Sequence, residues 1–358
     1  MSGIALASLH AEALRHNLAR ARVADPAAKL LAVIKADAYG HGMLPAAEAL
    51  SGAEGYAVAR VEEGVALREA GATKPILVLG GFYDQDSLEA CARHRLDCAL
   101  HDDGQLRLLE RHPPKIPLRL WLKLDSGMHR LGFDPGRAAE LTRRLDGAPG
   151  VVPGLRYMTH FANADDRDDD YTARQVERFK RALVGLPGER SLANSAALLA
   201  WPEARADWAR PGIMLYGCSP LLGTHGRDFD LRPVMTLETR LIAVRQLSAG
   251  EPVGYSGIWR TPAPRRIAVA AMGYGDGYPR VIKPDTPVLV AGRRAPIVGR
   301  VSMDTLCIDV TQVPEAEVGA RVVLWGEGLP VEEIAVAAGT IPYELLCRVS
   351  RRVRRVWR

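Results

Sequence analysis

Between residues 30 and 217 the chain alternates short apolar runs with amphipathic segments, and this alternation limits the possible folds more than any other feature. Parallel strands need long crossover connections, which helices usually supply. A strand followed by a helix, repeated eight times, therefore predicts a sheet that closes on itself as a (β/α)8 barrel. An open doubly wound sheet is the alternative. The predicted strands span Leu30–Lys35, Gly55–Ala59, Ile76–Gly80, Asp97–Leu100, Leu118–Leu124, Gly154–His160, Ser191–Asn194 and Trp208–Leu215.

The pattern changes after about Asp228, where apolar and polar residues alternate with period two and turn residues separate the runs. Thr236–Val244 is an example, and this half of the chain is predicted to be mostly β. The length of 358 residues, at about 150 residues per domain, also indicates two domains. We predict a barrel domain over residues 1–228 and a β domain over residues 229–358, with the first residues of the chain as candidates to join the β domain.

The composition is that of an ordinary enzyme-sized protein, with 47% apolar and 25% charged residues, which excludes a disordered or collagen-like chain. The 47 basic and 42 acidic residues give a net charge of only +5, so no nucleic-acid partner is expected. The arginine-rich end, Arg348–Arg358, is interpreted as a solvated strand edge rather than an RNA or lipid contact. The five cysteines form no C-x-x-C pair, and no leader-like or membrane-spanning apolar run is evident, so we predict a cytoplasmic protein without a membrane partner.

Lysine is rare in this chain, so a lysine at a strand end is informative. Lys35 ends the first predicted strand, which places its amine at the C-terminal mouth of the barrel, where barrel enzymes carry out their chemistry. A desolvated lysine amine is a nucleophile suited to Schiff-base formation with an aldehyde or ketone. Taken alone, Lys35 fits a snorkelling strand-end lysine equally well.

Polar residues also end two further predicted strands at the same face of the barrel. His160 ends the sixth strand, and Asn194 ends the seventh with Ser195 directly after it. A single strand-end histidine is usually structural, but polar residues at successive strand ends favour a site. No grouping of histidine, cysteine and carboxylate residues has the spacing of a metal site, so no metal is expected.

The segment Ala32–Gly42, which contains Lys35, resembles the cofactor-lysine motif of the alanine racemases, a family of barrel-type enzymes that use pyridoxal 5′-phosphate (PLP). The resemblance continues in the family's order over nearly the whole chain. One departure is Ser302, where many members of the family have cysteine, and it removes no catalytic group. The further matching motifs are Trp121–Phe133, Arg210–Gly217, Val253–Gly257, Gly273–Tyr278, Val298–Asp304 and Thr340–Glu344.

This resemblance implies two catalytic residues and a set of cofactor contacts. Lys35 is implied to carry the cofactor and to act as one base, and Tyr255 is implied to be the second base. His160 is implied to bridge catalytic groups, and Arg210 to donate a hydrogen bond to the ring nitrogen of the cofactor. The full set of implied cofactor-binding residues is Lys35, Tyr39, His160, Asn194, Ser195, Arg210, Gly212, Ile213 and Tyr343.

The resemblance also implies a substrate side of the pocket. Arg130 is implied to orient the substrate or the oxygen of the cofactor ring, since a guanidinium fork suits a carboxylate or phenolate. Lys123 is implied to be carbamylated so that it holds Arg130, and an ion pair with a carboxylate such as Asp125 is the alternative. The residues implied to bind or shape the substrate are Arg130, Tyr255, Met303, Asp304 and Tyr274.

The implied reaction is the interconversion of L- and D-alanine by two bases on opposite faces of Cα, serving peptidoglycan synthesis or alanine breakdown. In this family the tyrosine comes from the β domain of a partner subunit, which implies a homodimer with shared active sites. Two alternatives stay open. One is a Schiff-base aldolase in which Tyr39, Ser195 and Gly212 hold a sugar phosphate. The other is a PLP-carrying binding protein, which a second domain with Tyr255 argues against.

Overall fold

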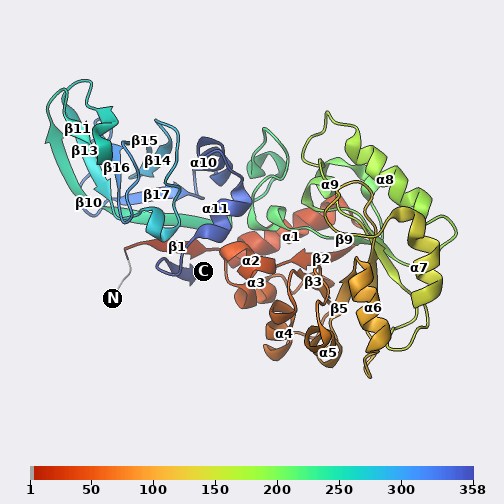
Figure 1. Cartoon of the computed structure of the whole chain (residues 1–358). Coiled ribbons are helices and arrows are strands. Elements are labelled where there is room, and N and C mark those ends of the chain that lie inside the picture. The colour runs from red at the N-terminus through yellow and green to blue at the C-terminus, as the bar shows by residue number, and fades with distance from the viewer. Residues whose placement is uncertain (1–3) are drawn as a thin grey trace.

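The eight predicted barrel strands form a closed parallel barrel in the computed structural model, which describes residues 4–358 (Figure 1). The strands pair in chain order and the last pairs with the first, so the barrel is confirmed and the open doubly wound sheet is excluded. Residues 1–3, which open the predicted barrel domain, lie outside the described residues. The strands are β2 (Lys29–Val33), β3 (Gly55–Val58), β4 (Ile76–Val78), β5 (Asp97–Leu100), β6 (Leu120–Lys123), β7 (Arg156–Met158), β8 (Arg190–Ser191) and β9 (Trp208–Ala209).

Helices connect the barrel strands and cover the outside of the barrel (Figure 1). Side-chain caps fix where several of them begin; for example, the Asp84 carboxylate accepts a hydrogen bond from Ser87 N at 2.8 Å at the start of α5. The buried face of α6 includes Leu106 and Leu109, as an amphipathic helix on a sheet requires. The helices are α1 (Ala11–Ala24), α2 (Lys35–Gly40), α3 (Met43–Ala49), α4 (Val61–Glu69), α5 (Gln85–Arg93), α6 (Asp103–Arg111), α7 (Ala138–Leu145), α8 (Tyr171–Ala182) and α9 (Ser195–Ala200).

The first barrel strand ends earlier than predicted. The predicted strand Leu30–Lys35 ends at Val33, and Lys35 instead begins the short element α2. The backbone of this element is left-handed, because Ala36–Tyr39 all have φ between 52° and 54°. Four consecutive non-glycine residues in this conformation cost about 1–2 kcal/mol each, so the rest of the structure must hold the turn in place.

The eighth barrel strand is also shorter than predicted. The predicted strand Trp208–Leu215 ends at Ala209, and Ile213–Tyr216 form a 3-10 helix. Pro211 has no N–H to continue the ladder, and Gly212 donates its N–H to Ser195 Oγ at 2.8 Å. The chain therefore leaves the barrel at the point where the strand-end residues gather.

The second half of the chain is mostly β, as predicted, and builds an eight-stranded sheet in the order β13-β16-β15-β14-β17-β10-β1-β18. Strand β10 (Met235–Leu247) pairs with β17 along its first part and with β13 along its second, so the strands from β13 to β10 in this order close on one another. The other elements are β11 (Pro252–Val253), β12 (Trp259–Arg260), β13 (Arg265–Ala270), β14 (Pro287–Val290), β15 (Arg293–Val298), β16 (Leu306–Asp309), β17 (Arg321–Trp325), α10 (Val331–Ala337), α11 (Pro342–Arg348) and β18 (Arg354–Trp357).

Both ends of the chain meet in this sheet. Strand β1 (Leu6–Leu9) pairs antiparallel with β10 and parallel with β18, so residues near the N-terminus pair outside the barrel. The arginine-rich end of the chain supplies β18, which is the last strand of the sheet.

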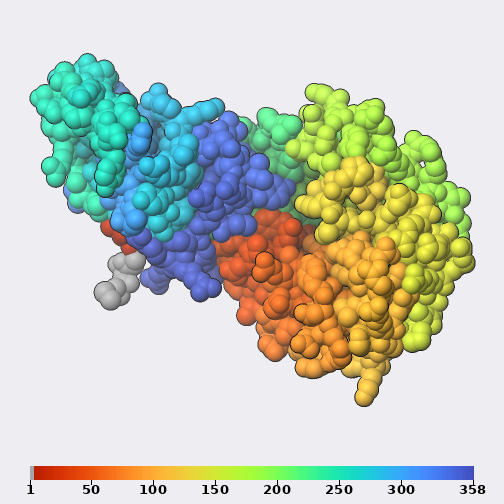
Figure 2. Space-filling view, in the orientation of Figure 1, coloured from red at the N-terminus to blue at the C-terminus, as the bar shows by residue number. Residues whose placement is uncertain are grey.

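The barrel and the sheet lie side by side, with the C-terminal helices at the junction (Figures 1 and 2). Helix α11 packs on the turn after Lys35 so closely that a Cβ at Gly40 would lie 2.3 Å from Leu346 O. Gly40 also has φ +79°, which favours glycine on conformational grounds. None of the helices within residues 4–358 is long and apolar enough to span a membrane.

Candidate active site

A cavity of about 150 Å³ opens at the C-terminal ends of the barrel strands. It brings together eleven of the residues singled out in the sequence: Lys35, Tyr39, Lys123, Arg130, His160, Asn194, Ser195, Arg210, Gly212, Ile213 and Tyr343. Three apolar residues that the sequence analysis did not single out complete the lining: Val33, Leu79 and Met158. They are ordinary barrel-strand or strand-end residues, so no local signal distinguished them.

Lys35 reaches this cavity from the start of the left-handed turn. Burial lowers the pKa of its amine, and the positive charge of Arg130 lowers it further, whereas the negative charge of Glu63 opposes both effects. Lowering the pKa increases the fraction of neutral amine at a given pH, and the neutral amine is the nucleophilic form.

One corner of the cavity presents small polar groups and close backbone. The Asn194 side chain accepts a hydrogen bond from Ala197 N at 2.9 Å and so fixes the start of α9, where Ser195 is the first residue. Ser195 Oγ lies 2.8 Å from Gly212 N. A Cβ at Gly212 would lie 2.5 Å from the Tyr39 hydroxyl, so a larger residue would close this corner.

The Tyr39 ring is held in the same corner by its neighbours. It stacks on Tyr216, with 4.6 Å between ring centroids, and lies 5.9 Å from the ring of Tyr343. Tyr343 comes from α11, so the second half of the chain contributes to the wall of the barrel cavity. Tyr216 belongs to a motif quoted from the sequence, but its stacking role has no sequence signal.

Arg210 is a buried cation in the wall of the cavity. Its two terminal nitrogens donate to the Ser191 carbonyl oxygen at 2.9 Å and the Thr159 carbonyl oxygen at 2.6 Å, among other acceptors. Its Nε donates to no acceptor among the described residues. Burial lowers the pKa of Arg210 to about 10, which still leaves it charged near neutral pH.

His160 lies beside Arg210 and is neutral near neutral pH. Burial holds the pKa of its ring well below the usual value, and the charges of Arg210 and Lys123 act in the same direction. An Arg210 terminal nitrogen lies 3.5 Å from His160 Nδ1, the longest contact that this guanidinium makes. A neutral ring can accept from this donor and keep its other nitrogen for a second partner.

Lys123 is buried among cations, and no carboxylate within residues 4–358 lies at ion-pair distance from it. Burial, with the charges of Arg210 and Arg130, lowers the pKa of Lys123 to about 8. Asp125, the alternative partner proposed from the sequence, instead pairs with His129 at 3.2 Å and accepts hydrogen bonds from Gly127 N and His129 N. The alternative prediction, an ion pair between Lys123 and Asp125, is therefore wrong.

Known proteins match the chain along nearly its whole length. The family model described as alanine racemase, N-terminal domain, matches residues 9–220, and the one described as alanine racemase, C-terminal domain, matches residues 234–357. A curated alanine racemase from Thioalkalivibrio sulfidiphilus is 53% identical over 358 residues, which cover 99% of each chain. The chain belongs to the alanine racemase family.

Solved structures of the alanine racemase family show the same fold. Biosynthetic alanine racemase from Pseudomonas aeruginosa superposes with a TM-score of 0.96 at 45% identity, covering 99% of both chains. Alanine racemase from Bartonella henselae, solved with covalently bound pyridoxal phosphate, has a TM-score of 0.88 at 29% identity and also covers 99% of both chains.

The remaining residues that the alanine racemase resemblance singled out do not line the Lys35 cavity of their own chain. Tyr255 lies in the segment between β11 and β12 and is 70% exposed, and Met303 is 53% exposed. Asp304 is also exposed and pairs with Arg352 at 2.7 Å. Tyr274 begins a 3-10 helix near Met303 on the same part of the sheet, where its N–H donates to Ser302 O.

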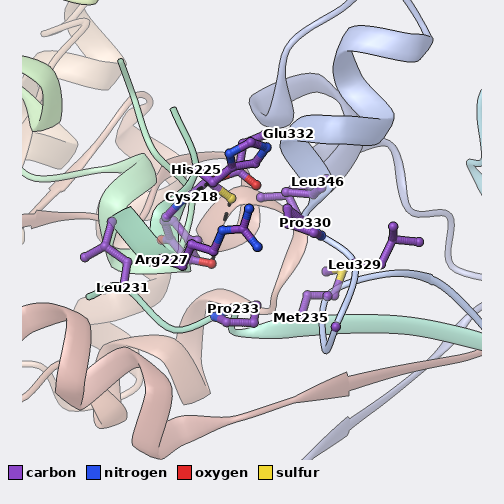
Figure 3. Close-up of a pocket in the computed structure, with 16 residues that line it drawn as sticks. Cys218, His225, Arg227, Leu231, Pro233, Met235, Leu329, Pro330, Glu332 and Leu346 are labelled. Atoms are coloured by element: carbon purple, nitrogen blue, oxygen red, sulfur yellow. Dashed lines mark hydrogen bonds between the residues drawn. The ribbon is translucent and has the colours of Figure 1, made fainter. Parts of the chain in front are cut away.

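A second cavity, of about 180 Å³, lies between the chain that leaves the barrel and the helices α10 and α11 (Figure 3). None of the proposed catalytic or cofactor residues lines it. Glu332 Oε1 accepts hydrogen bonds there from Ser219 N and Gly226 N, both at 2.9 Å, and so joins the segment between the barrel and β10 to α10. Residues 4–358 contain no group of three or more His, Cys, Asp or Glu side chains arranged to hold a metal ion.

Proposed function

We propose that the chain interconverts L- and D-alanine with PLP held in the Lys35 cavity. One observation carries the proposal: Lys35, Arg210 and the corner formed by Ser195 and Gly212 converge at the C-terminal mouth of one barrel. A barrel aldolase would share the lysine but would not need a buried arginine beneath its reacting group. Membership of the alanine racemase family supports the same reaction.

The residues of the cavity fit PLP. Ser195 Oγ, the backbone around Gly212 and Ile213, and the hydroxyls of Tyr39 and Tyr343 form the corner in which we place the phosphate. Gly212 has no side chain to cover its backbone, and a Cβ there would lie 2.5 Å from the Tyr39 hydroxyl. When bound, PLP supplies an aldehyde for the amino group and a ring that stabilises negative charge developing at Cα.

Arg210 determines how strongly the ring can withdraw electrons. Its two terminal nitrogens are engaged by protein acceptors, so we assign Nε as the donor to the ring nitrogen. A guanidinium donates but cannot accept, so Arg210 would favour the unprotonated form of a ring nitrogen bound against it. A weaker electron sink limits side reactions that a dedicated racemase must avoid.

Two groups move the proton. The Lys35 amine serves one face of Cα and the Tyr255 hydroxyl serves the other, each contributing about 10² to 10⁴ in rate. Tyr255 lies outside the cavity of its own chain and is exposed, which suits a residue supplied to a second subunit. We therefore propose a homodimer in which Tyr255, Met303 and Asp304 of each chain complete the cavity of the other.

Arg130 and Lys123 form the opposite wall. With a pKa near 8, the Lys123 amine is partly neutral near neutral pH. A neutral amine adds to carbon dioxide, forming a C–N bond and releasing one proton, and the resulting carbamate is an anion. We propose that this anion faces Arg130 and replaces the ion pair that Asp125 does not make.

We propose a biosynthetic role in the cytoplasm. The Pseudomonas aeruginosa protein is named a biosynthetic alanine racemase, which supports a role in supplying D-alanine for peptidoglycan. Five free cysteines, three of them buried, suit the reducing cytoplasm that we propose as the location. We also propose that residues 1–228 and 229–358 act as two units, with β1 joining the second.

The visible absorption spectrum of the purified protein before and after borohydride, followed by solvent-deuterium exchange at Cα of both alanine isomers, tests this function. We expect a reducible chromophore and exchange from both isomers, with both lost in Lys35→Ala. A chromophore without exchange would indicate a PLP carrier. If no chromophore forms even after PLP is added, Lys35 would instead serve an aldolase reaction or a structural role.

A further inference from the structure

The left-handed turn after Lys35 is an unfavourable backbone conformation that needs external support. Ala36–Tyr39 have φ of 52° to 54°, and none of them is glycine. The direction in which Lys35 enters the cavity depends on this turn, because Lys35 is the residue immediately before it. Whatever holds Ala36 in place therefore also sets the backbone from which Lys35 extends.

Three side chains hold the turn. His41 Nδ1 lies 3.0 Å from Ala38 O and 2.9 Å from Tyr39 O, and Arg355 Nε donates to Gly40 O at 2.8 Å. These contacts support the far end of the turn. At the near end, Ala36 N donates to Glu63 Oε1 at 2.7 Å.

Glu63 links this turn to a neighbouring barrel strand. Its second oxygen, Oε2, accepts hydrogen bonds from Ala59 N at 2.8 Å and Arg60 N at 3.0 Å, directly after β3. The carboxylate therefore joins the ends of two adjacent strands, β2 and β3, through three backbone N–H groups. Hydrogen bonds to a charged acceptor are stronger than those to a neutral one.

We propose that Glu63 is the positioning residue for Lys35: its carboxylate fixes the left-handed turn at Ala36 and places a negative charge beside the lysine amine. Glu63 does not line the cavity, so it acts through Lys35 rather than on the substrate. The inference rests on the proposed function for the role of Lys35, but the hydrogen bond to Ala36 does not depend on it.

The charge of Glu63 balances cations around Lys35. The groups that face this amine are Arg130 in the loop after β6, Lys123 on β6, and Cys347 on α11, with His160 beyond β7. Burial and Arg130 lower the pKa of Lys35, and Glu63 opposes them. Removing the Glu63 charge therefore lowers the pKa of Lys35 further.

The test uses the full-length chain and three variants. Glu63→Gln removes the charge and one of the two acceptor oxygens. Glu63→Asp keeps the charge but is shorter by one methylene, so it cannot reach both strand ends. Glu62→Gln is the matched control, because Glu62 is the exposed neighbour on the same helix.

Two readouts separate positioning from general damage. Hydrogen exchange at the Ala36 amide reports the tether, and the pH dependence of the rate at which added PLP attaches to cofactor-free protein reports the Lys35 pKa. In both Glu63 variants we expect the Ala36 amide to exchange at least about ten times faster than in the wild type. The PLP attachment profile should move to lower pH in Glu63→Gln and less in Glu63→Asp, and Glu62→Gln should match the wild type in both.

Wild-type exchange at Ala36 together with an unmoved pH profile in Glu63→Gln would overturn the proposal. Loss of near-ultraviolet circular dichroism in both Glu63 variants would also overturn it, because Glu63 would then support the whole fold. If the wild type itself fails to attach PLP, the proposed function fails, while the Ala36 exchange still decides the tether.

Discussion

At the scale of single residues, Tyr255 lies outside the cavity in which it is proposed to act as a base. It is exposed and absent from the Lys35 cavity of its own chain. Its assignment came from the motif Val253–Gly257, because nothing in the local pattern distinguishes a catalytic tyrosine from an ordinary half-buried one. Lys35, by contrast, was indicated by its position at a barrel strand end as well as by its motif.

Tyr255→Phe removes one proton donor and leaves Lys35 intact. We expect racemisation to slow by about 10² to 10⁴ in both directions, because the two enantiomers have equal free energy and both bases are needed to cross between them. Solvent exchange at Cα should persist for the isomer whose α-proton faces Lys35 and be lost for the isomer whose α-proton faces Tyr255. Equal exchange of both isomers, at wild-type rates, would contradict the two-base assignment.

Lys123 provides a second prediction at this scale. With its pKa lowered to about 8, its amine should take up carbon dioxide more readily as the pH rises toward 8. Carbon-13 NMR of protein equilibrated with labelled bicarbonate should show a carbamate signal that Lys123→Gln abolishes. Lys115→Gln, which changes an exposed lysine, is the control and should keep the signal. Persistence of the signal in Lys123→Gln would show that the carbamate lies elsewhere.

At the scale of elements, the sequence indicated the barrel strands well and their ends poorly. Apolar runs bounded by capping residues such as Asp84 mark strands and helices, because burial and capping are local properties. The left-handed turn Ala36–Tyr39 has no such signal, since alanine, aspartate and tyrosine rarely adopt positive φ. It depends on Glu63, 27 residues further along the chain, a contact that no local pattern shows.

His41 gives this turn a measurable pH dependence. Burial lowers the pKa of His41 to about 4 from 6.5, so the unfolded chain binds the proton more tightly than the folded one. Stability should therefore fall as the pH drops from about 6.5 to about 4, by at most about 1.4 kcal/mol per pH unit. Chemical unfolding at a series of pH values gives the slope of the unfolding free energy against pH. This slope should be shallower by that amount in His41→Asn, whereas His112→Asn, which changes an exposed histidine, should keep the wild-type slope. Identical slopes in wild type and His41→Asn would contradict the assignment.

At the scale of the whole molecule, one chain does not contain a complete set of the proposed catalytic groups in one cavity. The barrel supplies Lys35, Arg130 and Arg210, and loops between strands of the second half of the chain expose Tyr255 and Met303. Within the chain, helix α11 brings Tyr343 from the second half to the barrel cavity. The sequence predicted both parts, but only the family resemblance predicted that they serve different subunits.

Mixing two inactive variants tests the shared active site most directly. Lys35→Ala and Tyr255→Phe chains, unfolded together and refolded in equal amounts, form mixed dimers in which one cavity has both defects and the other has neither. Random pairing makes half of the dimers mixed, so the account predicts recovery of about a quarter of wild-type racemase activity. Each variant refolded alone should stay at least about 100-fold below the wild-type rate. No recovery, in a mixture shown to contain mixed dimers, would mean that Lys35 and Tyr255 of the same chain act together, and would contradict the account.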